Sequence, residues 1–184
     1  MMNVYQKFGA VVALSGVFNM AQAFELSSTD ISAGGRLTQQ AVYNGFGCSG
    51  GNTSPALQWK NAPKGTEYFA ITVFDPDAPT GSGWWHWQVV NIPKQVSSLP
   101  SGAGEVSKLT MPKEAMQMRN DFGSNGFGGA CPPEGHGPHR YQFTVYALPQ
   151  KLNIPQDASG ALVGYMLNAQ ALATSSIEVL YERP

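Results

Sequence analysis

Two short segments rich in glycine and proline hold all three histidines of the chain, together with several carboxylates and aromatic side chains. The first contains Asp75, Asp77 and His86, and the second runs from Pro132 to Tyr141. Carboxylates beside imidazoles can transfer protons, bind a metal ion or orient hydrogen bonds to a ligand. Because each segment adjoins a strand-like run, we expect both to present these groups from a strand scaffold.

The first segment begins with a rigid corner. Pro76 and Pro79 end the preceding strand-like run, so Asp75 and Asp77 lie at a sheet edge. Turn aspartates commonly accept hydrogen bonds from nearby backbone amides, which is one interpretation of both acids. The other interpretation is that the two acids are a pair of functional carboxylates.

The aromatic run after the corner contains an imidazole among indoles. Strand alternation along Trp84-Trp85-His86-Trp87-Gln88 predicts that Trp84, His86 and Gln88 share one face. The two intervening tryptophans would then lie on the other face. An imidazole with apolar neighbours suits a binding cleft, although a histidine satisfied within the core is the alternative.

The second segment supplies further hydrogen-bond donors. Alternation places His139 and Tyr141 on one face and Arg140 on the other, where we expect an ion pair. Glycines 135 and 137 shape a loop whose amides could face an anion. Together with His86, these donors suit an oxyanion such as phosphate or carboxylate.

The N-terminus has the pattern of a signal peptide. Lys7 precedes an apolar run over residues 8–18, and Ala21-Gln22-Ala23 is a small-residue cleavage signal. We expect residues 1–23 to be removed and residues 24–184 to form a single domain. The mature protein would then be located in the periplasm or be secreted. A retained anchor is the alternative, but the run is short of the ~20 residues that span a membrane.

Charge excludes some classes of partner. The leader holds one of the 11 basic residues and no acidic residue, so 10 basic and 12 acidic residues remain. These show no basic cluster, which argues against nucleic acid or a polybasic membrane surface as the partner.

Cys48 and Cys131 are the two cysteines. In an exported chain, an even pair predicts a disulfide, and two separate thiols are the alternative. A disulfide that closes a loop of this length would lower the entropy of the unfolded chain and so stabilise the fold by about 4.5 kcal/mol at most.

Strand patterns dominate the chain and indicate a mainly β fold, an antiparallel sandwich or barrel with long Gly/Pro-rich loops. We expect one helix near residues 161–173, with Ser159 as its N-cap, and irregular structure over 94–130. The predicted strands are 67–74, 85–92, 140–148 and 177–181, with weaker candidates at 24–31 and 57–60.

The motifs are similar to those of the phosphatidylethanolamine-binding protein family, also called the Raf kinase inhibitor-like family. The Asp75–Pro79 corner and the run from Pro133 to Tyr141 resemble two of its signatures. Residues 119–129 and 48–55 resemble its bacterial branch. The resemblance implies an antiparallel β-sandwich whose small pocket at one end binds anions, with no metal or other cofactor. The positions that carry over are Asp75, Asp77, His86, Pro133, His139 and Tyr141, with Trp84 as a wall.

Two departures from the family pattern matter. Cys131 stands where many relatives have glycine, so a bond to Cys48 would pin one side of the pocket mouth. The leader is the second departure, because many relatives are cytosolic. Regulation of cytosolic kinases is therefore not carried over.

Two rival chemistries deserve comparison. Gly47–Gly51 fits Gly-x-Ser-x-Gly around Ser49, but no helix pattern follows it, as a serine hydrolase requires. The carboxylates and histidines, His136 included, are also of types that ligate metals, although no helix fixes their spacing.

The sequence thus predicts an exported binding protein that is not an enzyme. His86, His139 and Tyr141 would donate hydrogen bonds to a small anionic ligand, and Asp75 and Asp77 would orient the donors. An interaction or inhibitor protein, whose surface binds a protease or another protein, is the alternative function. The sequence leaves the oligomeric state open, and a homodimer is compatible with it.

Overall fold

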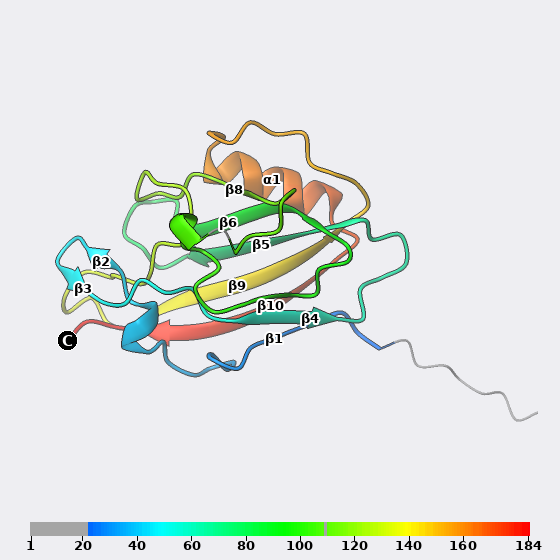
Figure 1. Ribbon diagram of the computed structural model, residues 1–184. Helices are drawn as coiled ribbons and strands as arrows, with labels where there is room; N and C mark the ends of the chain where they lie inside the picture. Colours follow the sequence, from blue (N-terminus) through cyan, green and yellow to red (C-terminus); the bar gives the residue numbers. More distant parts are fainter. Residues whose placement is uncertain (1–21, 109) are drawn as a thin grey trace, which may run out of the picture.

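The fold is built on a five-stranded antiparallel sheet with the order β10-β9-β5-β6-β8 (Figure 1). The computed structural model describes residues 22–108 and 110–184. The expected leader, residues 1–23, therefore lies almost wholly outside the described residues. The strands of this sheet are β5 (Tyr68–Asp75), β6 (Trp84–Pro93), β8 (Met116–Gln117), β9 (His139–Leu148) and β10 (Ala173–Tyr181).

A smaller sheet and one helix cover the two faces of the large sheet (Figure 1). The small sheet has the order β1-β4-β7, and a separate hairpin pairs β2 with β3. Short 3-10 helices, η1 (Gln39–Ala41) and η2 (Val106–Lys108), lie in the loops. The remaining elements are β1 (Glu25–Ser27), β2 (Asn44–Gly45), β3 (Cys48–Ser49), β4 (Leu57–Lys60), β7 (Ser98–Leu99) and α1 (Gly160–Gln170).

Alternation along β9 explains why the large sheet has two apolar faces. Tyr141, Phe143 and Val145 enter the core between the sheets, whereas Tyr146 and Leu148 join the cluster under α1. Burying each such side chain stabilises the fold by roughly 1.5–3 kcal/mol. The β9 strand therefore holds the two layers together.

The strong strand predictions and the helix are confirmed. Ser159 caps α1, since its hydroxyl oxygen accepts a hydrogen bond from the Leu162 amide at 3.2 Å. The helix ends at Gln170, earlier than expected, because β10 already begins at Ala173. The β2–β3 hairpin was not predicted, since its strands are only two residues long.

A β-bulge in β6 corrects the predicted faces of the aromatic run. Val73 pairs with Trp87 and the next residue, Phe74, pairs with Trp85, so His86 is an extra residue in β6. Beyond a bulge the alternation is inverted. Trp87 therefore enters the core between the sheets with His86, and the predicted grouping of His86 with Gln88 was wrong.

The other face of β6 rests on the helix. The Gln88 amide donates a hydrogen bond to the Gly160 carbonyl at 3.1 Å. A Cβ atom at Gly160 would lie 2.3 Å from the Trp85 ring, so glycine permits this close approach. Contacts with α1 therefore fix the position of β6, and His86 points from the face of β6 opposite to the helix.

Among the described residues, no helix is both long and apolar enough to cross a membrane.

Candidate ligand-binding site

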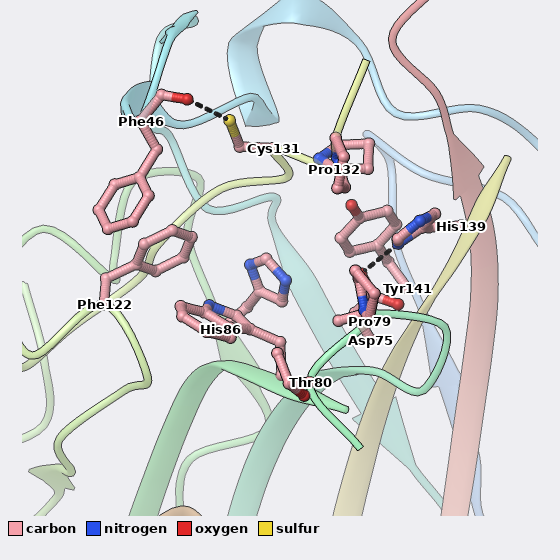
Figure 2. Close-up of a pocket in the computed structure, with 13 residues that line it drawn as sticks. Phe46, Asp75, Pro79, Thr80, His86, Phe122, Cys131, Pro132, His139 and Tyr141 are labelled. Carbon is pink, nitrogen blue, oxygen red and sulfur yellow. Dashed lines mark hydrogen bonds and ion pairs between the residues drawn. The ribbon is translucent and has the colours of Figure 1, made fainter. Parts of the chain in front are cut away.

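A cavity of about 240 Å³ lies where β5 ends and where β6 and β9 begin. Figure 2 shows Phe46 and Phe122 on one side of it and His139 with Asp75 on the other. Six of the seven ligand-binding residues expected from the sequence line it, namely Asp75, Trp84, His86, Pro133, His139 and Tyr141. The seventh, Asp77, is not among the lining residues.

Asp75 and His139 form a buried pair at the base of the cavity. Nδ1 of His139 donates to Oδ2 of Asp75 at 2.7 Å, and both side chains are 3% exposed or less. The other carboxylate oxygen of Asp75 accepts the Asp77 amide at 2.8 Å, so Asp75 both closes the turn and orients His139. The expected orienting role of Asp75 is thus visible in these contacts.

His136 extends this pair to the surface. Its Nδ1 lies 2.7 Å from Nε2 of His139, so both ring nitrogens of His139 have partners. His136 is exposed, on a loop with positive φ at Gly135 and Gly137. The sequence indicates His136 only as a possible metal ligand, because its contact with His139 depends on the loop conformation.

His86 is buried with one ring nitrogen turned away from the cavity. Its Nδ1 lies 2.8 Å from the Gly128 carbonyl oxygen and 3.1 Å from that of Gly129. Carbonyl oxygens only accept hydrogen bonds, so Nδ1 carries the proton. Burial lowers the pKa of His86 below its ordinary 6.5, although these carbonyls and the Asp75 carboxylate oppose the shift.

Two buried donors in the cavity lining have no partner among the described residues. They are the hydroxyl of Tyr141 and Nε1 of Trp84. Burial raises the pKa of the Tyr141 hydroxyl far above its ordinary value, and the Asp75 charge adds to this. The hydroxyl lies near the Asp75 carboxylate, but it does not meet full hydrogen-bond geometry with that group or with any other described atom, so it is a buried neutral donor without a partner.

Asp77 lies outside the cavity lining and binds Arg140, a neighbour in sequence of the lining residues His139 and Tyr141. Its carboxylate accepts hydrogen bonds from the backbone amide, Nε and Nη2 of Arg140, all at 2.8–2.9 Å. The hydrogen-bonded guanidinium lowers the pKa of Asp77 to about 2. Arg140 forms the expected ion pair, and Asp77 orients this arginine instead of a histidine.

An aromatic wall faces the polar groups. The Phe122 ring lies 5.2 Å from Trp84, 5.4 Å from His86 and 5.4 Å from Phe46, measured between ring centroids. Neither Phe46 nor Phe122 is among the pocket residues predicted from the sequence. Glycines on both sides of Phe46, within the sequence Asn-Gly-Phe-Gly-Cys, were the available signal of a turn that projects a side chain.

The predicted disulfide is present at the mouth of the cavity. Cys48 of β3 is bonded to Cys131, which lines the cavity, and their Cα atoms lie 6.0 Å apart. Arg183 reinforces this junction, since its guanidinium donates to the carbonyls of Gly47 and Pro132 and pairs with Glu134. One side of the mouth is therefore fixed covalently and by ion pairing.

The two rival sites considered from the sequence were a serine nucleophile at Ser49 and a metal centre. Ser49 lies in β3 and is not among the residues that line the cavity. Within residues 22–108 and 110–184, no group of three His, Cys, Asp or Glu side chains is arranged to hold a metal.

A family model described as phosphatidylethanolamine-binding protein matches residues 27–182, which is almost the whole described fold. The chain belongs to the phosphatidylethanolamine-binding protein family. The pocket of this family member is lined largely by residues of the motifs that carried the resemblance, Phe122 among them, together with Phe46.

Several relatives are similar along most of the chain. Protein YbcL of Escherichia coli K12 is 57% identical over 163 residues, which cover 88% of this chain and 89% of YbcL. Its crystal structure superposes with a TM-score of 0.85 at 56% identity, covering 88% of this chain and 99% of that one. YbhB of the same organism is 46% identical, covering 85% of this chain and 99% of YbhB.

A more distant relative is a putative lipoprotein, LppC of Mycobacterium tuberculosis. It is 36% identical over 131 residues, which cover 71% of this chain and 58% of LppC.

Proposed function

We propose that this family member is an exported binding protein that holds a small oxyanion, phosphate-like or carboxylate-like, in the cavity. It acts by binding, not by catalysis. The leader-like N-terminus, the Cys48–Cys131 disulfide and the similarity to a lipoprotein support the periplasm as its compartment.

The observation that carries this proposal is the pair of unsatisfied donors on Tyr141 and Trp84. A buried donor without a partner costs roughly 1–3 kcal/mol, and a ligand oxygen recovers that cost. Hydrogen bonds to a charged acceptor are also stronger than those between neutral groups. Ligand oxygens are therefore the natural complement of these two side chains.

The Asp75 carboxylate would repel an anion if it were unpaired. Its two oxygens instead accept from His139 and from the Asp77 amide. Both oxygens are thus engaged by donors of the protein, which supports a role for Asp75 in orienting His139 and the turn.

Titration calorimetry with inorganic phosphate tests the proposal. We expect wild-type protein to bind phosphate with millimolar or better affinity. Tyr141→Phe removes a donor worth about 1.5–3 kcal/mol to a charged ligand, so affinity should fall at least tenfold. Because the hydroxyl has no partner in the folded protein, the variant should be at least as stable as wild type.

Tyr146→Phe is the matched control. Tyr146 lies on the same strand but in the cluster under α1, so phosphate affinity should not change. No measurable phosphate binding by wild type, or equal affinity in the Tyr141→Phe variant, would contradict the proposal.

A further inference from the structure

Asp75, His139 and His136 form a chain of hydrogen bonds that runs from the core to the surface. Asp75 and His139 are buried, whereas His136 is exposed. Nδ1 of His139 lies 2.7 Å from Oδ2 of Asp75, a contact drawn in Figure 2, and Nε2 lies 2.7 Å from Nδ1 of His136. Because a carboxylate accepts hydrogen bonds, Nδ1 of His139 carries a proton. The contact between the two rings therefore depends on the nitrogens that face each other, Nε2 of His139 and Nδ1 of His136.

This contact between the rings requires a single proton between two nitrogens. When both rings are neutral, Nδ1 of His136 donates to the lone pair on Nε2 of His139. One extra proton leaves the hydrogen bond intact, because a charged ring donates to a neutral one, and Asp75 balances the charge. A second extra proton places a hydrogen on both facing nitrogens, so that neither accepts, and two positive charges then repel. The contact is therefore compatible with at most one extra proton.

The charged groups beside the pair offer a counter-charge for the first extra proton and not for a second. Asp75, at the end of β5, contacts the buried ring directly. Asp77, in the turn that follows, is bound by Arg140 at 2.8 Å. Glu134, on the same loop as the exposed ring, pairs with Arg183. Two of these three carboxylates thus already have arginine partners.

The remaining titratable groups around the pair do not supply a free negative charge. Tyr141 of β9 is neutral, because burial raises its pKa far above the ordinary value. Tyr181 of β10, which lies opposite the first residue of β9, is a phenol and is neutral at acid pH. Glu182, which follows it, is bound by Arg36 at 2.6 Å, and burial lowers the pKa of His86 in β6. A doubly charged pair would therefore lack a compensating charge among the described residues.

The tip of the loop, residues 135–138, has few contacts with the rest of the fold. Gly135 and Gly137 flank His136 with φ of 70° and 84°, and a Cβ at either glycine would meet no atom beyond the adjacent residues within 4 Å. Among the described residues, the contact with His139 is the one hydrogen bond that joins a side chain of the tip to the rest of the protein. Loss of this contact would therefore leave the tip free to move on its glycines.

Backbone hydrogen bonds connect the tip to its surroundings and to the cavity. The Gly135 amide donates to the Arg183 carbonyl at 3.1 Å, and the His136 amide donates to the Pro133 carbonyl at 3.3 Å. Pro132 and Pro133 line the cavity. A movement of His136 therefore reaches the cavity wall through Pro133.

We propose that the His136–His139 contact is an acid-sensitive latch, which holds the 131–138 loop against the fold and releases it when both rings become charged. The open loop binds one proton more than the closed loop. Its population therefore rises as the pH falls, by up to about tenfold per pH unit. Because imidazoles ordinarily titrate near pH 6.5, the latch is closed at pH 7.5 and opens in acid. The latch acts on the loop itself, whichever ligand the cavity holds.

NMR of the imidazole nitrogens tests the latch directly. At pH 7.5 we expect a ¹⁵N–¹⁵N coupling through the hydrogen bond between Nδ1 of His136 and Nε2 of His139, and it should vanish in a titration to pH 4.5. Over the same range, the Gly135 amide, bonded to the Arg183 carbonyl, should lose protection against hydrogen exchange at least threefold after correction for the intrinsic rate. The Val145 amide, within β9, should stay protected.

Two substitutions separate the latch from other effects of acid. His136→Asn keeps an amide donor close to the position of Nδ1 but cannot become charged, and His136→Ala removes the contact. We expect exchange at Gly135 to lose its pH dependence in both variants. A coupling that is absent at pH 7.5 or persists at pH 4.5, or a variant that keeps the wild-type pH response, would overturn the proposal. Loss of protection at Val145 together with Gly135 would assign the change to global unfolding and would also overturn it.

Discussion

At the scale of single residues, the site is defined by which hydrogen-bonding atoms are already paired. Both ring nitrogens of His139 have partners, whereas His86 has one paired nitrogen and faces the cavity with the other. The two histidines, which the sequence suggested as equivalent donors, therefore have different roles. His139 is part of a chain of side chains, and His86 is available to the ligand.

His86 makes the stability of the ligand-free protein sensitive to acid. Its pKa is lowered on folding, so the unfolded chain binds more protons below pH 6.5. The neutral ring's contribution to the free energy of unfolding is fully present above pH 6.5 and is lost as the pH falls toward the pKa of His86 in the folded protein. We expect this group to reduce the free energy of unfolding by up to about 1.4 kcal/mol per pH unit in that window.

NMR of the imidazole nitrogens, with urea unfolding at pH 7.5, 6.5 and 5.5, checks this. The spectra should show the proton of neutral His86 on Nδ1. A His86 that titrates at or above pH 6.5, or that carries its proton on Nε2, would contradict the account.

Residue spacing predicted the polar part of the site better than its apolar part. Alternation along one strand placed His139 and Tyr141 on the same face, and the family resemblance joined Asp75 to them. Phe46 and Phe122 come from loops whose conformation depends on contacts distant in sequence. The bulge at His86 was equally invisible, because an extra residue in a strand leaves no change of composition.

At the scale of elements, the mouth of the cavity depends on three segments joined together. The β2–β3 hairpin carries Phe46, the 131–138 loop carries His136, and the C-terminal segment carries Arg183. Phe46 has a φ of 53° and is 71% exposed, so the hairpin holds an aromatic side chain in a left-handed conformation at the surface. The disulfide fixes this hairpin to the loop.

Removal of the disulfide should therefore lower stability. We expect the Cys48→Ser/Cys131→Ser double variant to lose about 2–4 kcal/mol of unfolding free energy, since an 83-residue separation closes a long loop. Urea unfolding measures the loss. Wild-type protein unfolded in reductant is the control and should show the same loss, whereas a difference below about 0.5 kcal/mol would contradict this prediction.

At the scale of the whole molecule, the strand pattern was enough to predict an antiparallel β fold with one short helix. The order of the large sheet was not predictable from that pattern. β5 pairs with β9, which begins more than sixty residues later, and many pairings would satisfy the same alternation. Packing of both faces selects among them, between the small sheet on one side and α1 on the other.

The most direct test of oxyanion binding uses the indole N–H signals of the four tryptophans. In ¹H–¹⁵N spectra titrated with inorganic phosphate, we expect a saturable shift of the Trp84 signal, because its donor gains a partner. Trp59 in the core, Trp85 against α1 and Trp87, bonded to Gln117, should change little. A Trp84 signal that stays fixed at tens of millimolar phosphate would contradict the account.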